Sequence, residues 1–351
     1  MIVCGGEDEP LLHGGDLGAA RRLFPGAPEP FIDLSTGINP HPYPLPRFSA
    51  DLFARLPDPA SAGALAAVAA NVYGTPSAAH VVVAPGTQIL LPLVAGLIPA
   101  ARAAVLTPGY PEHGRAAAMA GHRVKAVGSI EACGDAALVI VGNPNNPDGR
   151  LTVRADLLGI ARDLRRRGGL LVVDEAFMDV GPPGASLAAD VACGNIVVLR
   201  SFGKFFGLAG VRLGFALAAP PLVARLGALL GPWAVSAAAL AVGAKALADA
   251  AWIERSRRRL AKAADEIDSI LAAADLAVIG GTSLFRLVQA PMASALFRHL
   301  GQAGIYVRCF PDNAHWLRFG LPGSPRQWRR FDQAMKSVGA RRRAKAVDQL
   351  R

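Results

Sequence analysis

The chain has 351 residues, of which 52% are hydrophobic and 18% charged, which excludes a disordered or fibrous protein and favours a compact chain of about two domains. Its net charge of +10 could attract nucleic acid or an acidic small molecule, but no nucleic-acid-binding motif accompanies the charge, so we expect no nucleic-acid partner. The cysteines contain no Cys-x-x-Cys pair, so they indicate neither a disulfide framework nor a metal site: Cys4, Cys133, Cys193 and Cys309.

We expect neither secretion nor a membrane span from this sequence. No basic segment followed by an apolar stretch opens the sequence. The most apolar window, 234–252, contains Lys245 and Asp249, which favours a buried amphipathic helix over a membrane span. We therefore expect a cytoplasmic protein with no membrane partner. The basic residues 341–343 are typical of a solubilising tail.

Residues 1–40 are rich in Pro and Gly and read as an arm more than as a domain. His13 and Gly14 open a His-Gly-Gly-Asp run, and a short extended piece at 31–34 is followed by polar residues and Gly37. Such a segment could bring backbone amides to a ligand. A solvated loop is an equally good interpretation of His13.

Strand and helix patterns alternate from residue 47 to residue 216. A helical pattern at 47–73, broken by prolines at 57 and 59, precedes the first strand, and helices are expected at 89–98 and 151–167. Strands are expected at 80–84, 101–106, 136–141, 169–173, 195–199 and 213–216. This order predicts an α/β domain with a mainly parallel, doubly wound sheet, whose ligands bind at the carboxyl ends of the strands.

Chemically useful residues follow these strands. The Pro85-Gly86-Thr87-Gln88 turn at the start of a helix has a phosphate-binding geometry, although many α/β units contain one. Tyr110 could stack on a planar cofactor or pack locally. The irregular turn 142–149, which contains Asn146, can present side-chain amides. Asp174 ends an apolar strand, where it either needs a cationic partner or caps the next turn.

The segment 201–214 combines a hydroxyl, an amine and a guanidinium on a glycine-rich turn, in Ser201, Lys204 and Arg212. An apolar strand precedes it, so Lys204 is expected to be desolvated and able to attack a carbonyl. Ser201 and Arg212 could bind a phosphate beside it. The alternative is a solvated basic loop. A carbonyl next to a phosphate describes pyridoxal 5'-phosphate (PLP).

After residue 220 the composition changes. Ala-rich helices are expected at 236–273, and short strands at 277–279, 283–288, 305–308 and 316–319 alternate with helices. These elements predict a smaller α+β domain. The expected division is an arm at 1–40 that joins the small domain, a large PLP-binding domain at 41–235, the small domain at 236–335 and a basic tail at 336–351.

The order of these motifs resembles the class I/II aminotransferase superfamily of fold-type I PLP enzymes, over about residues 30–335. The resemblance implies an aspartate aminotransferase-like PLP-dependent transferase fold and a homodimer. Lys204 matches the Schiff-base lysine, Asp174 the partner of the pyridinium nitrogen, Asn146 the partner of the phenolic oxygen and Tyr110 the stacking ring. The matching phosphate ligands are Gly86, Thr87, Gln88, Ser201 and Arg212.

The amino-terminal runs and Asp-Glu-Ala-Phe-Met-Asp at 174–179 resemble the L-threonine O-3-phosphate decarboxylases of cobalamin biosynthesis. This resemblance implies PLP-dependent conversion of a small phosphorylated amino acid, threonine phosphate, to (R)-1-amino-2-propanol O-2-phosphate. Candidate substrate ligands are His13, Gly14, Gly37, Asn146, Arg308 and Arg318, and the residues do not divide phosphate from carboxylate binding.

Two alternatives remain. The chain also resembles histidinol-phosphate aminotransferases, although Phe177 and Leu56 stand where those enzymes often carry tyrosines. A noncatalytic PLP-fold regulator of transcription belongs to another class. It would need a DNA-binding helix-turn-helix before the PLP fold, and the segment available is too short and too rich in Pro and Gly.

Overall fold

The computed structural model describes residues 13–348, with side chains as far as residue 338. The chain divides into two compact units, and each is described by itself. The large unit is Pro42–Arg255, and the small unit combines the residues before it with those from Ser256 onward. The boundary therefore follows Arg255 and not residue 235, because helix α9 (Ala237–Ala248) packs against α3 (Pro59–Tyr73) in the large unit.

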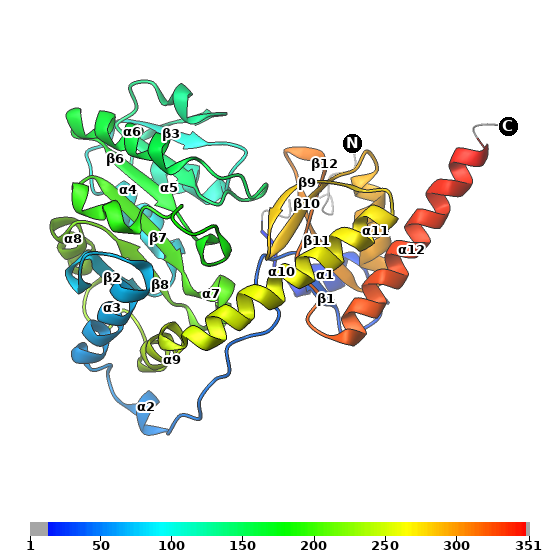
Figure 1. Ribbon diagram of the computed structural model, residues 1–351, viewed down its shortest axis with the longest axis horizontal. Helices are drawn as coiled ribbons and strands as arrows, with labels where there is room; N and C mark the ends of the chain where they lie inside the picture. The colour runs from blue at the N-terminus through cyan, green and yellow to red at the C-terminus, as the bar shows by residue number, and fades with distance from the viewer. Residues whose placement is uncertain (1–12, 349–351) are drawn as a thin grey trace. The chain divides into compact units, whose positions relative to one another are not determined.

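The large unit is built on a seven-stranded sheet, counted over the described residues, in the order β2-β8-β7-β6-β5-β3-β4 (Figure 1). The strands are β2 (Val81–Ala84), β3 (Arg102–Leu106), β4 (Arg123–Val127), β5 (Leu138–Gly142), β6 (Leu170–Asp174), β7 (Ile196–Ser201) and β8 (Gly214–Leu217). Strand β8 is antiparallel to β2 and β7, and the pairs from β7 to β4 are parallel. The expected mainly parallel α/β sheet is confirmed.

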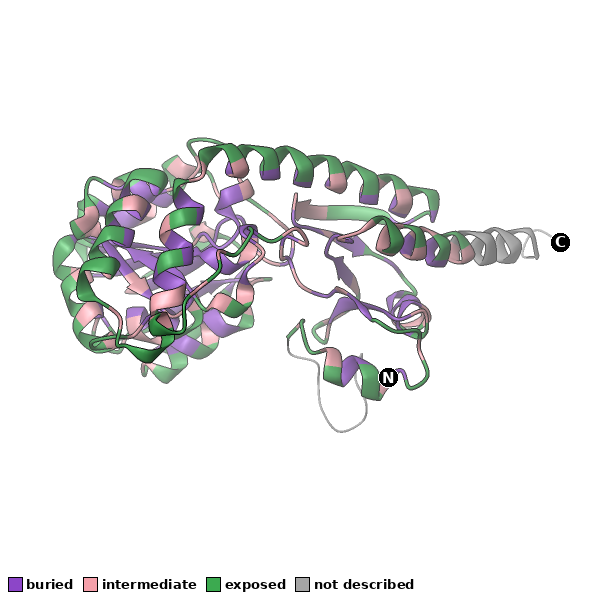
Figure 2. Cartoon of the chain, turned by 90° about the horizontal axis from the view of Figure 1, so that it is seen from below, coloured by how far each residue is buried: buried purple, intermediate pink, exposed green. Residues whose placement is uncertain are grey.

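Helices cover the sheet, which is buried between them while their outer sides are exposed (Figure 2). Besides α3 and α9, the large unit contains α2 (Asp51–Ala54), α4 (Thr87–Ala95), α5 (Pro111–Met119), α6 (Arg154–Arg166), α7 (Phe202–Phe205), α8 (Pro220–Leu230) and the 3-10 turns η1 (Ala78–His80), η2 (Ile130–Cys133), η3 (Met178–Val180), η4 (Ala188–Cys193) and η5 (Ala209–Val211). Alternate strand residues, such as Leu170 and Val172, form one core with α4, α5 and α8.

The small unit contains a five-stranded sheet within the described residues, in the order β1-β11-β12-β10-β9. Its elements are α1 (Leu17–Leu23), β1 (Ile32–Leu34), α10 (Ala250–Ala273, which begins before the boundary), β9 (Ala277–Thr282), β10 (Phe285–Gln289), α11 (Ala293–Gln302), β11 (Ile305–Phe310), β12 (Asn313–Phe319) and α12 (Pro325–Asp348). Strand β1 pairs with β11 in parallel, which places the amino-terminal arm in this sheet. Helix α12 continues through most of the stretch expected as a tail. Among the described helices, none is long and apolar enough to cross a membrane.

Candidate active site

The sheet registers bring the candidate site residues of the large unit to one edge. Strand β6 ends at Asp174, and β7 ends at Ser201, which lies opposite Gly214. Ala84, the last residue of β2, lies opposite Gly214 on its other side. Because β8 runs against its neighbours, its first residue lies where they end. The turns at 85–88 and 201–214 therefore meet beside Asp174.

Asp174 is held from two sides. One carboxylate oxygen, Oδ2, lies 2.8 Å from Nε2 of His113 on α5, and the other accepts a hydrogen bond from the backbone N–H of Ala176 at 3.1 Å. The side chain of His113 is 2% exposed, and its Nδ1 has no hydrogen-bond partner within the described structure. Our sequence reasoning missed His113, since a single histidine beside Glu112 carries no spacing signal.

Lys204 lies on the short helix α7 that follows β7, between the buried Phe202 and Phe205. Its Nζ lies 5.9 Å from the ring centroid of Phe177, a buried residue of the loop after Asp174. Gly203 leaves no room for a side chain, because a Cβ there would lie 2.8 Å from Cα of Ala209. The tight turn thus keeps the amine close to the end of β6.

The Gly86-Thr87 turn forms a cradle with Arg212. Gly86 precedes α4 with a φ of 96°, and no side chain caps the helix. A Cβ on Gly86 would lie 2.8 Å from Nη2 of Arg212, and a Cβ on Gly214 would lie 2.8 Å from the amide nitrogen of Thr87. Backbone N–H groups at a helix start, a guanidinium and the nearby Ser201 are the donors that a phosphate requires.

Gln88 forms hydrogen bonds with two side chains at the start of α5. Its Nε2 donates to Oε2 of Glu112 at 2.9 Å, and its Oε1 accepts from the hydroxyl of Tyr110 at 3.0 Å. Gln88 therefore orients the ring expected to stack on a cofactor. Asn146 is half-buried in a turn braced by Asn145, whose Nδ2 donates to the Pro108 carbonyl at 2.8 Å.

The remaining expected residues lie in the small unit. Arg308 and Arg318 are cross-strand neighbours on β11 and β12, and both are buried. Burial and the adjacent Arg308 lower the pKa of Arg318 to about 9, against the opposing effect of Asp33. Two buried guanidinium groups side by side suit an anionic ligand.

The arm meets this pair at Ser35. Nη2 of Arg318 donates to the Ser35 carbonyl at 2.9 Å, and the Ser35 hydroxyl accepts from the backbone of Gly15 at 2.8 Å. Gly14 packs directly against Ser35, whereas His13 is exposed and Gly37 is buried. The small unit thus brings most of the proposed substrate residues into one neighbourhood.

A family model described as aminotransferase class I and II matches residues 48–331. The chain belongs to this family. It is 42% identical to a threonine-phosphate decarboxylase of a Sinorhizobium species, over 93% of this chain and 98% of the relative. A threonine-phosphate decarboxylase of Pseudomonas aeruginosa is 40% identical, over 93% of this chain and 97% of its own. The solved histidinol-phosphate aminotransferase of Sinorhizobium meliloti has the same fold, with a TM-score of 0.78 and 21% identity over 92% of this chain and 94% of its own.

Membership confirms the expected fold and PLP as the expected cofactor. The residues at the sheet edge fit this group. The cradle of Gly86, Thr87 and Arg212 has the donors for its phosphate, and it has no room for a larger residue at Gly86. The carboxylate of Asp174, fixed by His113, suits a protonated ring nitrogen. Lys204 carries an amine that could react with the aldehyde of this group.

Proposed function

We propose that this PLP-dependent enzyme decarboxylates L-threonine O-3-phosphate to (R)-1-amino-2-propanol O-2-phosphate, a step of cobalamin biosynthesis. The observation that carries this proposal is the likeness to two threonine-phosphate decarboxylases, at 42% and 40% identity over nearly the whole of each chain. The chain has lysine, aspartate and arginine at the positions where catalytic members of the family carry them, which supports a catalytic protein over a noncatalytic regulator.

We assign the following roles to the residues. When bound, PLP accepts the electron pair that remains after carbon dioxide leaves the substrate carbon. Asp174 keeps a proton on the ring nitrogen, and His113 keeps the Asp174 carboxylate in place. The amine of Lys204 returns a proton to the carbon that lost the carboxylate. Arg318 and Arg308 bind the anionic groups of the substrate, whose anchoring decides which bond is broken.

Histidinol-phosphate transamination is the competing reaction. Phe177, which lies under the Lys204 amine, replaces the tyrosine that such enzymes often carry at this position, so the hydroxyl is missing there. Product analysis separates the two reactions. Threonine phosphate should yield carbon dioxide and the amine in equal amounts without an amino acceptor. Glutamate formation that depends on both 2-oxoglutarate and histidinol phosphate would contradict the proposal.

The oligomer and the cellular location rest on the family resemblance. We infer a homodimer in the cytoplasm. Apolar side chains on the surface of the large unit, with Phe53 and Leu56 each 68% exposed, support association with a second copy. Analytical ultracentrifugation tests the dimer, and a monomer at micromolar concentration would contradict it.

A further inference from the structure

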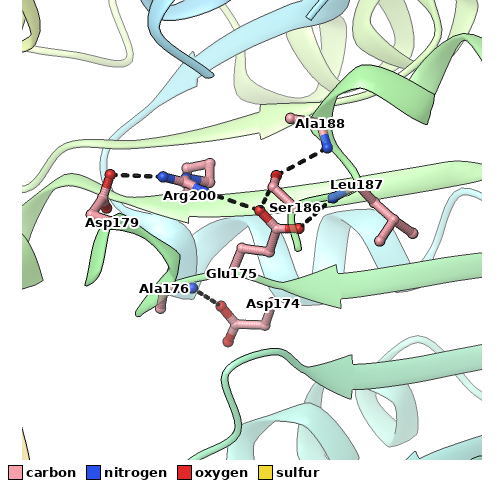
Figure 3. Close-up of polar contacts among 8 residues, drawn as sticks. All are labelled: Asp174, Glu175, Ala176, Asp179, Ser186, Leu187, Ala188 and Arg200. Carbon is pink, nitrogen blue, oxygen red and sulfur yellow. Dashed lines mark hydrogen bonds and ion pairs between the residues drawn. The ribbon is translucent and has the colours of Figure 1, made fainter. Parts of the chain in front are cut away.

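A buried cluster of charges lies behind the residues that face the cofactor. Arg200 of β7 is 5% exposed, and its Nη1 lies 3.0 Å from Oε2 of Glu175. Its Nη2 lies 2.7 Å from Oδ1 of Asp179, and its Cζ lies 4.3 Å from the ring centroid of Tyr73. One guanidinium thus joins two carboxylates (Figure 3).

The second half of the cluster fixes Glu175. Its Oε2 also accepts from the Ser186 hydroxyl at 2.6 Å, and its Oε1 accepts from the backbone N–H of Leu187 at 2.8 Å. The Glu175 side chain is fully buried. Burial raises the pKa of Glu175, and Arg200 and these hydrogen bonds act in the opposite direction. Removing one charge would leave its partner buried and uncompensated.

The pleat of the sheet puts this cluster on the face opposite the cofactor residues. Leu170 and Val172 belong to the core with α4 and α5, and by alternation Asp174 points to that face. Glu175 comes next in the chain and points away from Asp174 (Figure 3). Arg200 and Ser201 are adjacent in β7 and alternate in the same way.

Arg200 forms ion pairs with residues at both ends of one loop. The loop begins at Glu175, carries Phe177 below the Lys204 amine, and reaches Asp179 on η3. Arg200 itself belongs to the strand that leads directly into α7, on which Lys204 lies. The two ion pairs therefore tie the loop after Asp174 to the segment that carries the lysine.

We propose that Arg200 is a positioning residue, which acts through Glu175 and Asp179 to hold Asp174 and Phe177 in place relative to Lys204. It thereby sets how tightly the chain binds PLP and the pH at which the lysine-bound cofactor loses its proton. This inference rests on the proposed function, because it requires PLP to be joined to Lys204.

The test compares Arg200→Lys and Asp179→Asn with a control. Lysine keeps the charge but cannot reach two carboxylates in the planar fork of arginine. Asp179→Asn keeps Arg200 and its contact with Glu175. The control is Arg154→Met. Arg154 forms an ion pair of 2.6 Å with Asp190 in the same unit, and its side chain is 42% exposed. For each protein we would measure the Kd of PLP, the pH midpoint of its visible absorbance and the Tm.

Both test variants should bind PLP about tenfold more weakly, as expected when a supporting layer is lost, and should shift the pH midpoint. Arg154→Met should keep the wild-type Kd and midpoint. If Arg200→Lys does not fold, Asp179→Asn decides. If Asp179→Asn kept the wild-type Kd of PLP and the wild-type pH midpoint, the inference about Arg200 would be overturned while the proposed function stood. The same would follow if the control changed as much as the test variants. If the PLP-loaded wild-type protein did not show the visible absorbance of a lysine-bound cofactor, the proposed function would be overturned as well.

Discussion

His113 and Asp174 are 61 residues apart in the chain, yet Nε2 of the imidazole lies 2.8 Å from Oδ2 of the carboxylate. The contact joins the first turn of α5 to the carboxyl end of β6. The Asp174 side chain is only 12% exposed, so water has little access to this contact. The carboxylate is thus fixed before a cofactor binds, which lowers the cost of binding.

Replacing His113 by phenylalanine should therefore weaken PLP binding. The ring volume is kept and the partner of Asp174 is lost, so we expect the Kd of PLP to rise about tenfold. Decarboxylation should fall further, because the carboxylate is less well oriented. The control is His80→Phe, which removes a half-buried histidine of the same unit bonded to Ser77. An unchanged Kd in His113→Phe would contradict the role given to His113.

The phosphate cradle is tested by two glycine substitutions. Gly86 and Gly74 have φ angles of 96° and 77°, so alanine strains the backbone at both, by about 1–3 kcal/mol. A Cβ on Gly86 meets Arg212 at 2.8 Å, whereas a Cβ on Gly74 meets nothing within 4 Å. Gly86→Ala should therefore lose more stability in urea than Gly74→Ala, because Gly86 has a ψ of 162°, in a region that only glycine adopts readily, whereas Gly74 is in the left-handed helical region. Only Gly86→Ala should bind PLP more weakly. Equal PLP binding in the two would mean that the phosphate lies elsewhere.

The sequence predicted the buried strands because their apolar runs are short and bounded by Gly, Pro and Asn. It missed β4 since this edge strand is mostly exposed and includes Arg123 and Lys125. The candidate site residues at the strand ends were predicted from motifs. The strand registers of the seven-stranded sheet bring the candidates of the large unit together. His113 and Arg200 could not be predicted in this way, because their partners are distant in the chain and only the folded sheet brings them close.

Arg318 should control substrate binding without affecting the cofactor. Replacing it by methionine removes a charged donor, and hydrogen bonds to charged groups contribute about 1.5–3 kcal/mol, so KM should rise about 10- to 100-fold. The Kd of PLP should not change. Arg286→Met is the control, since Arg286 on β10 of the same sheet is paired with Asp268 at 2.6 Å. Equal losses of substrate and PLP affinity would refute the assignment.

The pH dependence of substrate binding follows from the same residue. Burial, aided by Arg308, lowers the pKa of Arg318 to about 9, and only the charged guanidinium attracts an anion. Affinity should therefore be full below this pH and fall as the pH rises through it. Measurement of KM from pH 7 to 10 checks the direction. In Arg318→Lys the loss of substrate affinity should occur at a different pH. A pH profile of KM identical to that of the wild type would show that another group titrates.

The covalent link between PLP and Lys204 is the claim on which the other roles depend. Reduction of the purified protein with borohydride, followed by peptide mass mapping, reads this link directly. The predicted result is a phosphopyridoxyl group on Lys204 in the wild type and none in Lys204→Ala, which should also lose its visible absorbance. A label on another lysine, or no label on the PLP-loaded wild type, would contradict the account.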